Sequence, residues 1–254
     1  MTKTLKVISW NIAGGHTIKS LDMFDYEKEN LSYFADMIRK YAPDVICLQE
    51  THSNESRSIA SELAKLLHYE FVYENAASPS HIDESFMLGQ AIISRIPLKN
   101  MRTIVYPYPT FPLLFSDGRE AAHHDKILQI AQWGKVMIAN TQMMPLKIFS
   151  EEYDTENGAG FSKEIDEVLT SSLDTPLIFC GDFNFNQPVN AFPKMYKKFS
   201  IANALPDSVT RPDTTEKLAP DHILYSPELS IINAKVVETQ TDHFLCFAEF
   251  KIPE

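Results

Sequence analysis

The chain has 254 residues, of which 44% are hydrophobic and 22% charged, a composition typical of a folded globular protein rather than a disordered one. Its formal net charge of −11 argues against a protein that grips long nucleic acids through many lysines and arginines. The charge does not exclude phosphate substrates, because a bound divalent metal supplies positive charge locally. The three cysteines lie in apolar runs without CxxC spacing, which argues against a disulfide framework.

The chain shows no internal division. A length of this order often serves one α/β domain, and there is no linker, repeat or low-complexity tract, so we expect one domain over residues 1–254. The amino-terminal residues lack the apolar core of a signal peptide, and no apolar run reaches eighteen residues. We therefore expect a cytoplasmic protein without a transmembrane segment, and we favour a monomer.

The first part of the chain alternates strand and helix patterns. Residues 5–12, rich in β-branched and aromatic side chains, predict a strand that ends at paired glycines. Hydrophobic side chains at helical spacing predict helices over residues 26–41 and 59–67. The continuously apolar residues 44–50 predict a strand buried on both faces, and residues 69–74 predict another strand.

After residue 85 the pattern changes to short strand-like runs separated by Gly, Pro or charged turns. Such spacing predicts an antiparallel meander. Its runs cover residues 85–98, 101–107, 125–132 and 135–142. Beyond it we expect a helix over 161–170 and three closing strands, at 176–180, 221–226 and 243–252. The Pro-dense segment 106–112 favours a stiff surface connection over the wall of a substrate groove.

Polar side chains border several of the expected strands. The motif PLIFCGDFN ends an apolar strand pattern with Asp182 and Asn184, which in an extended chain would point to the same side. Other polar residues that close or open strand patterns are Asn11, Glu50, Asp221, Asp242 and His243. In a mixed sheet the end of one strand and the start of an antiparallel neighbour lie on one edge, so we expect these side chains to converge there.

Each of these residues, taken alone, also has an ordinary structural explanation as a turn former or a helix cap. Taken together, they offer the Asn, Glu and Asp oxygens that Mg²⁺ prefers, with Mn²⁺ as the alternative. The chain has no HExxH motif and its cysteines are isolated, which argues against a zinc site. The pattern favours a hydrolase that uses a hard cation.

Six motifs, in this order, carry a resemblance to a known family: SWNIAGG, DVICLQE, GQAIISRIPL, CGDFN, PDHILY and TDHFLCF. Together they resemble the endonuclease/exonuclease/phosphatase superfamily, which has the deoxyribonuclease I-like fold, over about residues 5 to 251. The resemblance implies a four-layer α/β sandwich of two packed mixed β-sheets flanked by helices. It also implies metal-dependent cleavage of phosphoesters at one edge of that sandwich.

The resemblance further implies roles for the residues at the strand ends. Glu50 corresponds to the principal Mg²⁺ ligand, with Asn11 and Asp242 nearby. Asp182 would orient and deprotonate the attacking water, and Asn184 would hold that water or a phosphate oxygen.

Two further residues match the family's phosphate-contacting pair. His243 resembles the histidine that contacts the scissile phosphate, and Asp221 resembles the carboxylate that pairs with it. A carboxylate beside an imidazole fixes its tautomer and favours its protonated form, which stabilises a negatively charged transition state.

One position departs from the family pattern. Where many members carry a second histidine in an NTH motif, this chain has NTQ, ending at Gln142. A neutral Gln donates a hydrogen bond to phosphate but carries no charge and transfers no proton at neutral pH. Gln142 and Arg119 are therefore substrate-binding candidates, and Arg119 or the pair His123 and His124 could supply the missing charge. A solvated turn is the ordinary explanation for this basic segment.

The superfamily includes nucleases, phosphatases and lipid phosphodiesterases, so the resemblance indicates the reaction and leaves the substrate open. We expect a phosphodiesterase or nuclease whose partner is nucleic acid or a nucleotide-like diester. The alternative enzyme is a phosphomonoesterase or a lipid head-group phosphodiesterase. A third hypothesis, a binding module with weak catalysis, is motivated by Gln142 and opposed by the retention of the other motif residues.

Overall fold

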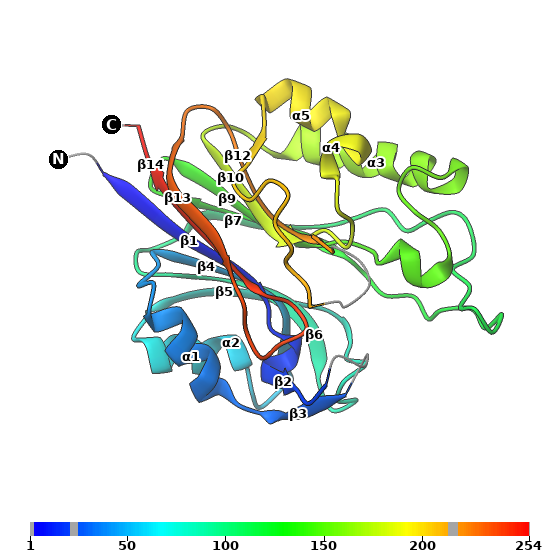
Figure 1. The fold of residues 1–254 in the computed structure, drawn as a ribbon, viewed down its shortest axis with the longest axis horizontal. Coiled ribbons are helices and arrows are strands. Elements are labelled where there is room, and N and C mark those ends of the chain that lie inside the picture. Colours follow the sequence, from blue (N-terminus) through cyan, green and yellow to red (C-terminus); the bar gives the residue numbers. More distant parts are fainter. Residues whose placement is uncertain (1–2, 21–24, 213–217, 254) are drawn as a thin grey trace.

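The computed structural model describes residues 3–20, 25–212 and 218–253. Two mixed sheets of six strands each pack face to face, and helices cover the outer face of each sheet (Figure 1). This arrangement is the four-layer α/β sandwich that the sequence resemblance implied, so the predicted fold class is confirmed. The smaller third sheet, of two strands, lies beside the first helical layer (Figure 1).

The first sheet brings together both ends of the described chain. In spatial order its strands are β13 (Ser230–Val237), β14 (Leu245–Lys251), β1 (Thr4–Asn11), β4 (Val45–Ser53), β6 (Met87–Ser94) and β5 (Phe71–Pro79). Only the central pair, β1 and β4, is parallel. Its outer face carries α1 (Leu31–Arg39) and α2 (Ile59–Leu67), near the small sheet of β2 (His16–Ile18) and β3 (Tyr26–Glu29).

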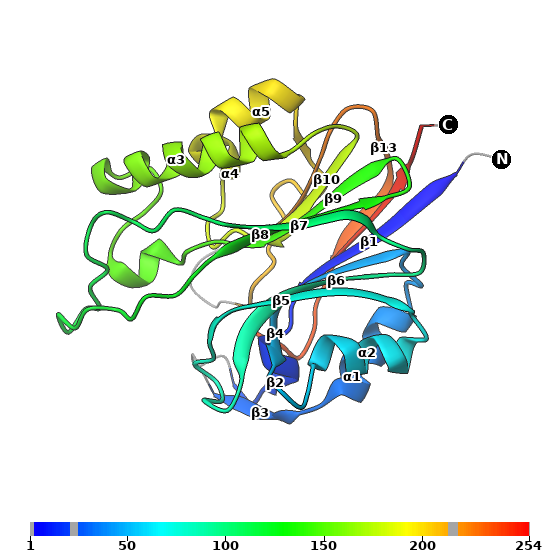
Figure 2. The same cartoon turned by 180° about the vertical axis from the view of Figure 1, so that it is seen from behind.

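The second sheet repeats this plan with a parallel pair, β9 and β10, at its centre. In spatial order its strands are β11 (Ala202–Asn203), β12 (Asp221–Tyr225), β10 (Leu177–Asp182), β9 (Val136–Gln142), β8 (Ile127–Trp133) and β7 (Lys99–Val105). Its outer face carries α3 (Glu156–Ser172), α4 (Pro188–Ala191) and α5 (Pro193–Phe199) (Figure 2). Within the described ranges no helix is long and apolar enough to cross a bilayer.

The alternation of side chains in β1 shows how one strand serves two cores. Leu5 and Val7 are buried in the cluster that fills the space between the two sheets. Ile8 and Trp10 point the other way and are buried against α1 and α2. Because successive strand residues face opposite sides, an almost continuously apolar strand is what a sheet covered on both faces requires.

Two expectations about the first half of the chain were wrong in detail. The helix expected over 26–41 begins only at Leu31, because residues 26–29 form β3 and the Asn30 side chain caps the helix by accepting from the Tyr33 amide. The expected meander is divided, because β6 and β7 belong to different sheets. The helix expected over 59–67 is confirmed as α2, where Ser58 is the N-cap.

The Pro-dense segment 106–112 is more deeply packed than a surface connection. Tyr106 is buried in the core beneath α3, where its hydroxyl accepts a hydrogen bond from Thr141. Tyr108 and Phe111 pack against the same core. The segment therefore packs aromatic side chains into the core of the second sheet, which the local sequence pattern did not indicate.

Candidate active site

Strand register places three polar side chains in one row across the second sheet. Asp182 at the end of β10 lies opposite Gln142 on β9 and opposite Asp221 on β12. From the first sheet, Asn11 ends β1, and its side-chain amide donates to Asp182 Oδ2 at 3.1 Å. The predicted convergence of strand ends at one edge is thus present in the structure.

Glu50 reaches this edge through an irregularity in β4. Gln49 pairs with Gln90 and Thr51 with Gly89, so Glu50 is an extra, unpaired residue in the strand. Its φ is +52°, a left-handed conformation that is uncommon for a residue with a side chain. A bulge of this kind re-aims a side chain and often occurs beside active sites. Because of this bulge, the direction of the Glu50 side chain cannot be deduced from the alternation of side chains along β4.

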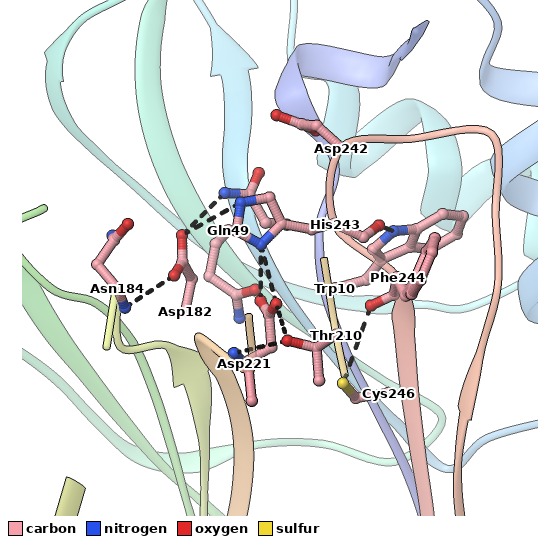
Figure 3. Close-up of polar contacts among 12 residues, drawn as sticks. Trp10, Gln49, Asp182, Asn184, Thr210, Asp221, Asp242, His243, Phe244 and Cys246 are labelled. Carbon is pink, nitrogen blue, oxygen red and sulfur yellow. Dashed lines mark hydrogen bonds and ion pairs between the residues drawn. The ribbon is translucent and has the colours of Figure 1, made fainter. Parts of the chain in front are cut away.

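His243 lies between two aspartates (Figure 3). Its Nδ1 is 2.9 Å from Asp221 Oδ2 and 3.1 Å from Oδ1, while its Nε2 is 3.9 Å from Asp182 Oδ2. Burial opposes the cationic form, but attraction by Asp221 and Asp182 outweighs it and raises the pKa of His243 to about 10. The imidazole is therefore cationic at neutral pH, with Nδ1–H donated to Asp221.

Asp182 is a buried carboxylate held by two donors. The Asn11 amide binds Oδ2, and the Asn184 backbone N–H donates to Oδ1 at 3.0 Å. Burial and the neighbouring carboxylates Asp221 and Glu50 raise the pKa of Asp182, although His243 has the opposite effect. A carboxylate with a raised pKa is a stronger base than an exposed one.

The sequence suggested that Asn184 and Asp182 lie in one extended segment, and this expectation was wrong. The strand ends at Asp182, and Asn184 has a left-handed φ of +58°. Its side-chain Nδ2 donates to the Met143 carbonyl oxygen at 2.9 Å. The two residues are therefore linked by a tight turn beyond the strand rather than by sharing one face of it.

Gln142 connects Glu50 to a lysine that the sequence did not single out. Gln142 Nε2 donates to Glu50 Oε1 at 2.6 Å, and Gln142 Oε1 accepts from Lys126 Nζ at 3.3 Å. Burial lowers the pKa of Lys126, while attraction by Glu50 and Asp182 partly restores it. Lys126 immediately precedes β8, so this cation lies beside the position where the family's second histidine is missing.

Glu50 itself is held in its ionised form. Burial alone would raise the pKa of Glu50, but His81, a hydrogen bond from Asn11 and attraction by His243 lower it below the ordinary value.

The other basic candidates lie in the segment before β8. Arg119 is exposed, and it pairs with Asp117 at 2.7 Å and lies over the Phe115 ring. His123 pairs with Asp125 at 2.8 Å. Arg119 thus occupies a surface turn, and within the described part of the chain it is Lys126 that contacts Gln142.

The Asp242 side chain points away from Asp182 and Asp221 (Figure 3), and it acts, like Glu50, on the pKa of Tyr26. Its Oδ2 accepts from the Tyr26 hydroxyl at 3.1 Å, and the repulsion that raises the pKa of Tyr26 comes, after burial, from Asp242 and Glu50 together. Its Oδ1 is buried and has no hydrogen-bond partner within the described residues. A buried carboxylate oxygen without a partner is unfavourable in a protein interior and is suited to a metal ion.

The donors around Glu50 fit a hard divalent cation. Glu50, Asp242 and the side-chain amide oxygen of Asn11, which also accepts from the Ala13 backbone N–H at 3.1 Å, are oxygen donors of the kind that Mg²⁺ prefers. A second group, Asp182, Asp221 and His243, has ligand atoms within 4.8 Å of one another. In that group the imidazolium offsets one of the two carboxylate charges and its Nδ1 is occupied by Asp221. Asp242 Oδ1, in contrast, has no hydrogen-bond partner within the described residues, so the Glu50 and Asp242 side is better suited to a cation.

The described part of the site sets four carboxyl groups, those of Glu50, Asp182, Asp221 and Asp242, against two basic groups, those of His243 and Lys126. A phosphate would add further negative charge to this excess. A divalent cation beside Glu50 and Asp242 would offset part of this negative charge.

Besides Lys126, three residues that support the site were not predicted. Thr210 Oγ1 donates to Asp221 Oδ2 at 2.8 Å, and Trp10 Nε1 donates to the His243 carbonyl oxygen at 2.9 Å. Tyr26 is the third, through its bond to Asp242. Thr210 and Tyr26 do not adjoin a recognisable motif. Trp10 lies in the SWNIAGG motif, but the sequence predicted only a strand at this position.

Comparisons with known proteins agree with this geometry. The family model described as "Endonuclease/Exonuclease/phosphatase family" matches residues 8–243. A DNA-(apurinic or apyrimidinic site) endonuclease of Dictyostelium discoideum is 38% identical over 69 residues, which are 27% of this chain and 16% of that protein. The match thus spans less than a fifth of the relative's length.

Solved structures show the same fold. An endonuclease/exonuclease/phosphatase from Beutenbergia cavernae superposes with a TM-score of 0.73 and 16% identity, covering 98% of this chain and 72% of that one. ANGEL2, described as a 2′,3′-cyclic phosphatase in complex with adenosine-2′,3′-vanadate, superposes with a TM-score of 0.66 and 15% identity. The superposition covers 98% of this chain and 96% of the ANGEL2 chain. The family match over nearly the whole chain, on a fold that assembles its motif residues at one edge, means that this protein belongs to the endonuclease/exonuclease/phosphatase family of phosphoester hydrolases.

Proposed function

We propose that the protein is a Mg²⁺-dependent phosphodiesterase that cleaves nucleic acid or nucleotide-like diesters, with Mn²⁺ as an alternative metal and Asp182 as the general base. The observation that carries this proposal is the buried pair of Asp182 and His243, 3.9 Å apart. The carboxylate has a raised pKa, and the facing imidazole is held cationic. A base and a cation that face each other suit the attack of water on a phosphorus atom.

The divalent cation would be held by Glu50 and Asp242, with the side-chain amide oxygen of Asn11. When bound, it would polarise a phosphate oxygen and offset negative charge in the transition state. Tyr26 fixes the orientation of Asp242, and Gln142 fixes that of Glu50, through the hydrogen bonds described above.

The remaining steps belong to the chain's own side chains. Asp182 Oδ2 takes a proton from water as the water oxygen bonds to phosphorus and the P–O bond to the leaving group breaks, and the leaving oxygen takes a proton from water. Asn184, anchored to Met143, presents its amide oxygen to orient the attacking water. His243 keeps Nδ1–H on Asp221 and donates Nε2–H to a phosphate oxygen, since 3.9 Å is too long for a hydrogen bond to Asp182. Lys126 binds the phosphate on the side of Gln142.

The names of related proteins support a nucleotide-like substrate. The Dictyostelium relative is named as an endonuclease of DNA abasic sites, and the ANGEL2 structure contains an adenosine compound. One name concerns a nucleic acid and the other a nucleoside compound. For this chain the preference for a diester over a monoester or a lipid remains part of the proposal.

A matched substrate panel tests the proposal. It contains single- and double-stranded DNA, RNA, methyl p-nitrophenyl phosphate, p-nitrophenyl phosphate and sphingomyelin, each with Mg²⁺ and with EDTA. We expect hydrolysis of the diesters that requires Mg²⁺ and is restored when Mg²⁺ is returned after EDTA. Turnover limited to the monoester or to sphingomyelin, or turnover unaffected by EDTA, would contradict the proposal.

A further inference from the structure

A pocket of about 780 Å³ opens beside the site described above. Asn184 and Arg211 line it, and both adjoin the proposed catalytic groups. The Asn184 backbone binds Asp182, and Arg211 directly follows Thr210, which binds Asp221. A group attached to a phosphate at Asp182 therefore has this pocket next to it.

The volume of the pocket indicates the size of its ligand. Small-molecule sites in proteins typically measure about 300–1,000 Å³, and they hold molecules of drug or nucleotide size. At about 780 Å³, the pocket is much larger than a phosphate or a methyl group requires. It therefore has room for a base together with its sugar.

An anchored aromatic side chain forms part of the wall. Phe185 is half-buried and lines the pocket. Its ring packs on Tyr153 with ring centroids 4.3 Å apart, and its carbonyl oxygen accepts from His222 Nε2 at 3.0 Å. A fixed aromatic ring of this kind is a stacking surface for a nucleobase.

Four carboxamide side chains share the pocket with this ring, those of Asn184, Asn186, Gln187 and Asn190. Asn184 Nδ2 donates to Met143 and Asn186 Oδ1 accepts from the Ala219 N–H. Gln187 and Asn190 are exposed, and a side-chain amide carries both donors and an acceptor, which suits the mixed edge of a base or the hydroxyls of a sugar.

The lining also has apolar side chains, among them Leu146, Ile148 and Leu218, that either a base or an acyl chain would contact. An acyl chain would, however, remove the Gln187 and Asn190 amides from water without replacing their hydrogen bonds, which is unfavourable. The lining thus favours a nucleoside over a lipid tail.

The charges around the pocket limit how far a nucleic acid chain could continue through it. Arg211 is half-buried; its backbone N–H donates to the Leu218 carbonyl oxygen at 3.3 Å, and its guanidinium has no hydrogen bond or ion pair within the residues that the structure describes, so the side chain can bind an anion near the site. The loop that forms another wall contributes Glu152, Asp154 and Lys147, and its net charge is negative. Additional phosphates along that wall would be repelled.

We infer that this pocket binds the nucleoside portion of a nucleotide whose phosphate lies at Asp182 and His243, so the enzyme acts on a nucleotide ester or the end of a chain. This inference rests on the proposed function and narrows its substrate class. Phe185 stacks on the base, the carboxamides bind its edge and the sugar, and Arg211 binds the phosphate on the pocket side.

Two esters with the same leaving group test the inference: a p-nitrophenyl ester of thymidine 5′- or 3′-phosphate and methyl p-nitrophenyl phosphate. Asn190→Trp on the short helix α4 places a large side chain in the pocket, and the adjacent Val189→Trp is its control, because Val189 is 45% exposed and does not line the pocket. We expect Asn190→Trp to lower kcat/KM for one thymidine ester by about 5- to 150-fold, the effect of losing one base stack. The methyl ester should be hydrolysed equally by all three proteins.

Binding measurements separate this inference from the proposed function. Calorimetry with thymidine and adenosine 3′- and 5′-monophosphates should show binding to the unaltered protein and to Val189→Trp, with loss in Asn190→Trp. If the nucleotides bind in this way but no ester is hydrolysed, the proposed function fails and the pocket assignment stands. Equal hydrolysis of both esters without this binding difference would overturn the inference alone, as would tighter binding of phosphocholine or glucose 6-phosphate.

Discussion

Replacing Lys126 by methionine tests whether this lysine provides the cation on the side of the site where the second family histidine is missing. Lys126 Nζ lies 3.3 Å from Gln142 Oε1, and Gln142 in turn binds Glu50. Methionine has a flexible, unbranched side chain of similar size. The substitution therefore removes the charge and largely retains the packing.

The expected loss follows from one hydrogen bond between a cation and the phosphate. Such a bond contributes about 1.5–3 kcal/mol. We therefore expect Lys126→Met to lower kcat/KM by about 10- to 150-fold. Stability should change by less than about 1 kcal/mol, because the lost bond to Gln142 is offset by the removal of a partly buried charge.

The assay compares kcat/KM for methyl p-nitrophenyl phosphate in Mg²⁺ with the free energy of unfolding from denaturant titration. Lys126→Arg retains the charge and should keep most of the activity. Lys135→Met, at the exposed turn between β8 and β9, removes an equal charge away from the site and should have no effect on kcat/KM. Unchanged kcat/KM in Lys126→Met, or a loss that merely follows a loss of stability, would refute the reasoning.

Three further predictions concern pH and backbone conformation. Asp221→Asn removes the main attraction that raises the pKa of His243 to about 10, so kcat/KM should fall much more at pH 8 than at pH 6, where His243 remains partly cationic. Burial lowers the pKa of His222 to about 4, so about 3 kcal/mol of stability should be present above pH 6.5 and lost as pH falls towards 4. In His222→Gln the free energy of unfolding, measured by urea titration, should depend less steeply on pH over this range. Gly14 has a φ of +65° and an added Cβ would overlap the His52 ring, so Gly14→Ala should lower the unfolding free energy by about 2–5 kcal/mol in a denaturant titration.

Each of these predictions has a result that would contradict it. An equal loss at pH 6 and pH 8 in Asp221→Asn would show that Asp221 does not act through the charge of His243. A stability profile for His222→Gln parallel to that of the unaltered protein would remove His222 as a cause of acid sensitivity. Gly118→Ala is the control for Gly14→Ala, because Gly118 has a φ of +82° but open space around it, and should cost about 1–2 kcal/mol. Equal costs at both glycines would contradict the overlap.

Elements with a strong apolar pattern were predictable, whereas elements that depend on their neighbours were not. The helix at 59–67 and the strands around β1 and β10 have patterns that local sequence displays. Strand β13 was missed because it lies at the sheet edge and most of its side chains are exposed, so it lacks an apolar period. The short helices α4 and α5 were missed as well, although a proline in the first turn of each was an available signal.

The same division applies to the site. Asp182 and Asp221 adjoin apolar strands, so their convergence follows from sheet geometry. The direction of Glu50 depends on a bulge that interrupts the two-residue period, and no period in the sequence predicts an interruption. Lys126 and Tyr26 reach the site from segments distant in sequence, and only the packed fold shows their contacts with Gln142 and Asp242.

The central claim is that Asp182 activates water in a metal-dependent hydrolysis of phosphodiesters, and Asp182→Asn tests it most directly. The measurement is kcat for the best diester substrate at saturating Mg²⁺, together with the thermal midpoint. We predict a loss of about 10²- to 10⁴-fold in kcat. Stability should not decrease with it, because burial disfavours the Asp182 carboxylate. A general base is expected to contribute about 10²- to 10⁴-fold to the rate, so a variant whose kcat stays within about threefold of the unaltered protein's would contradict the account.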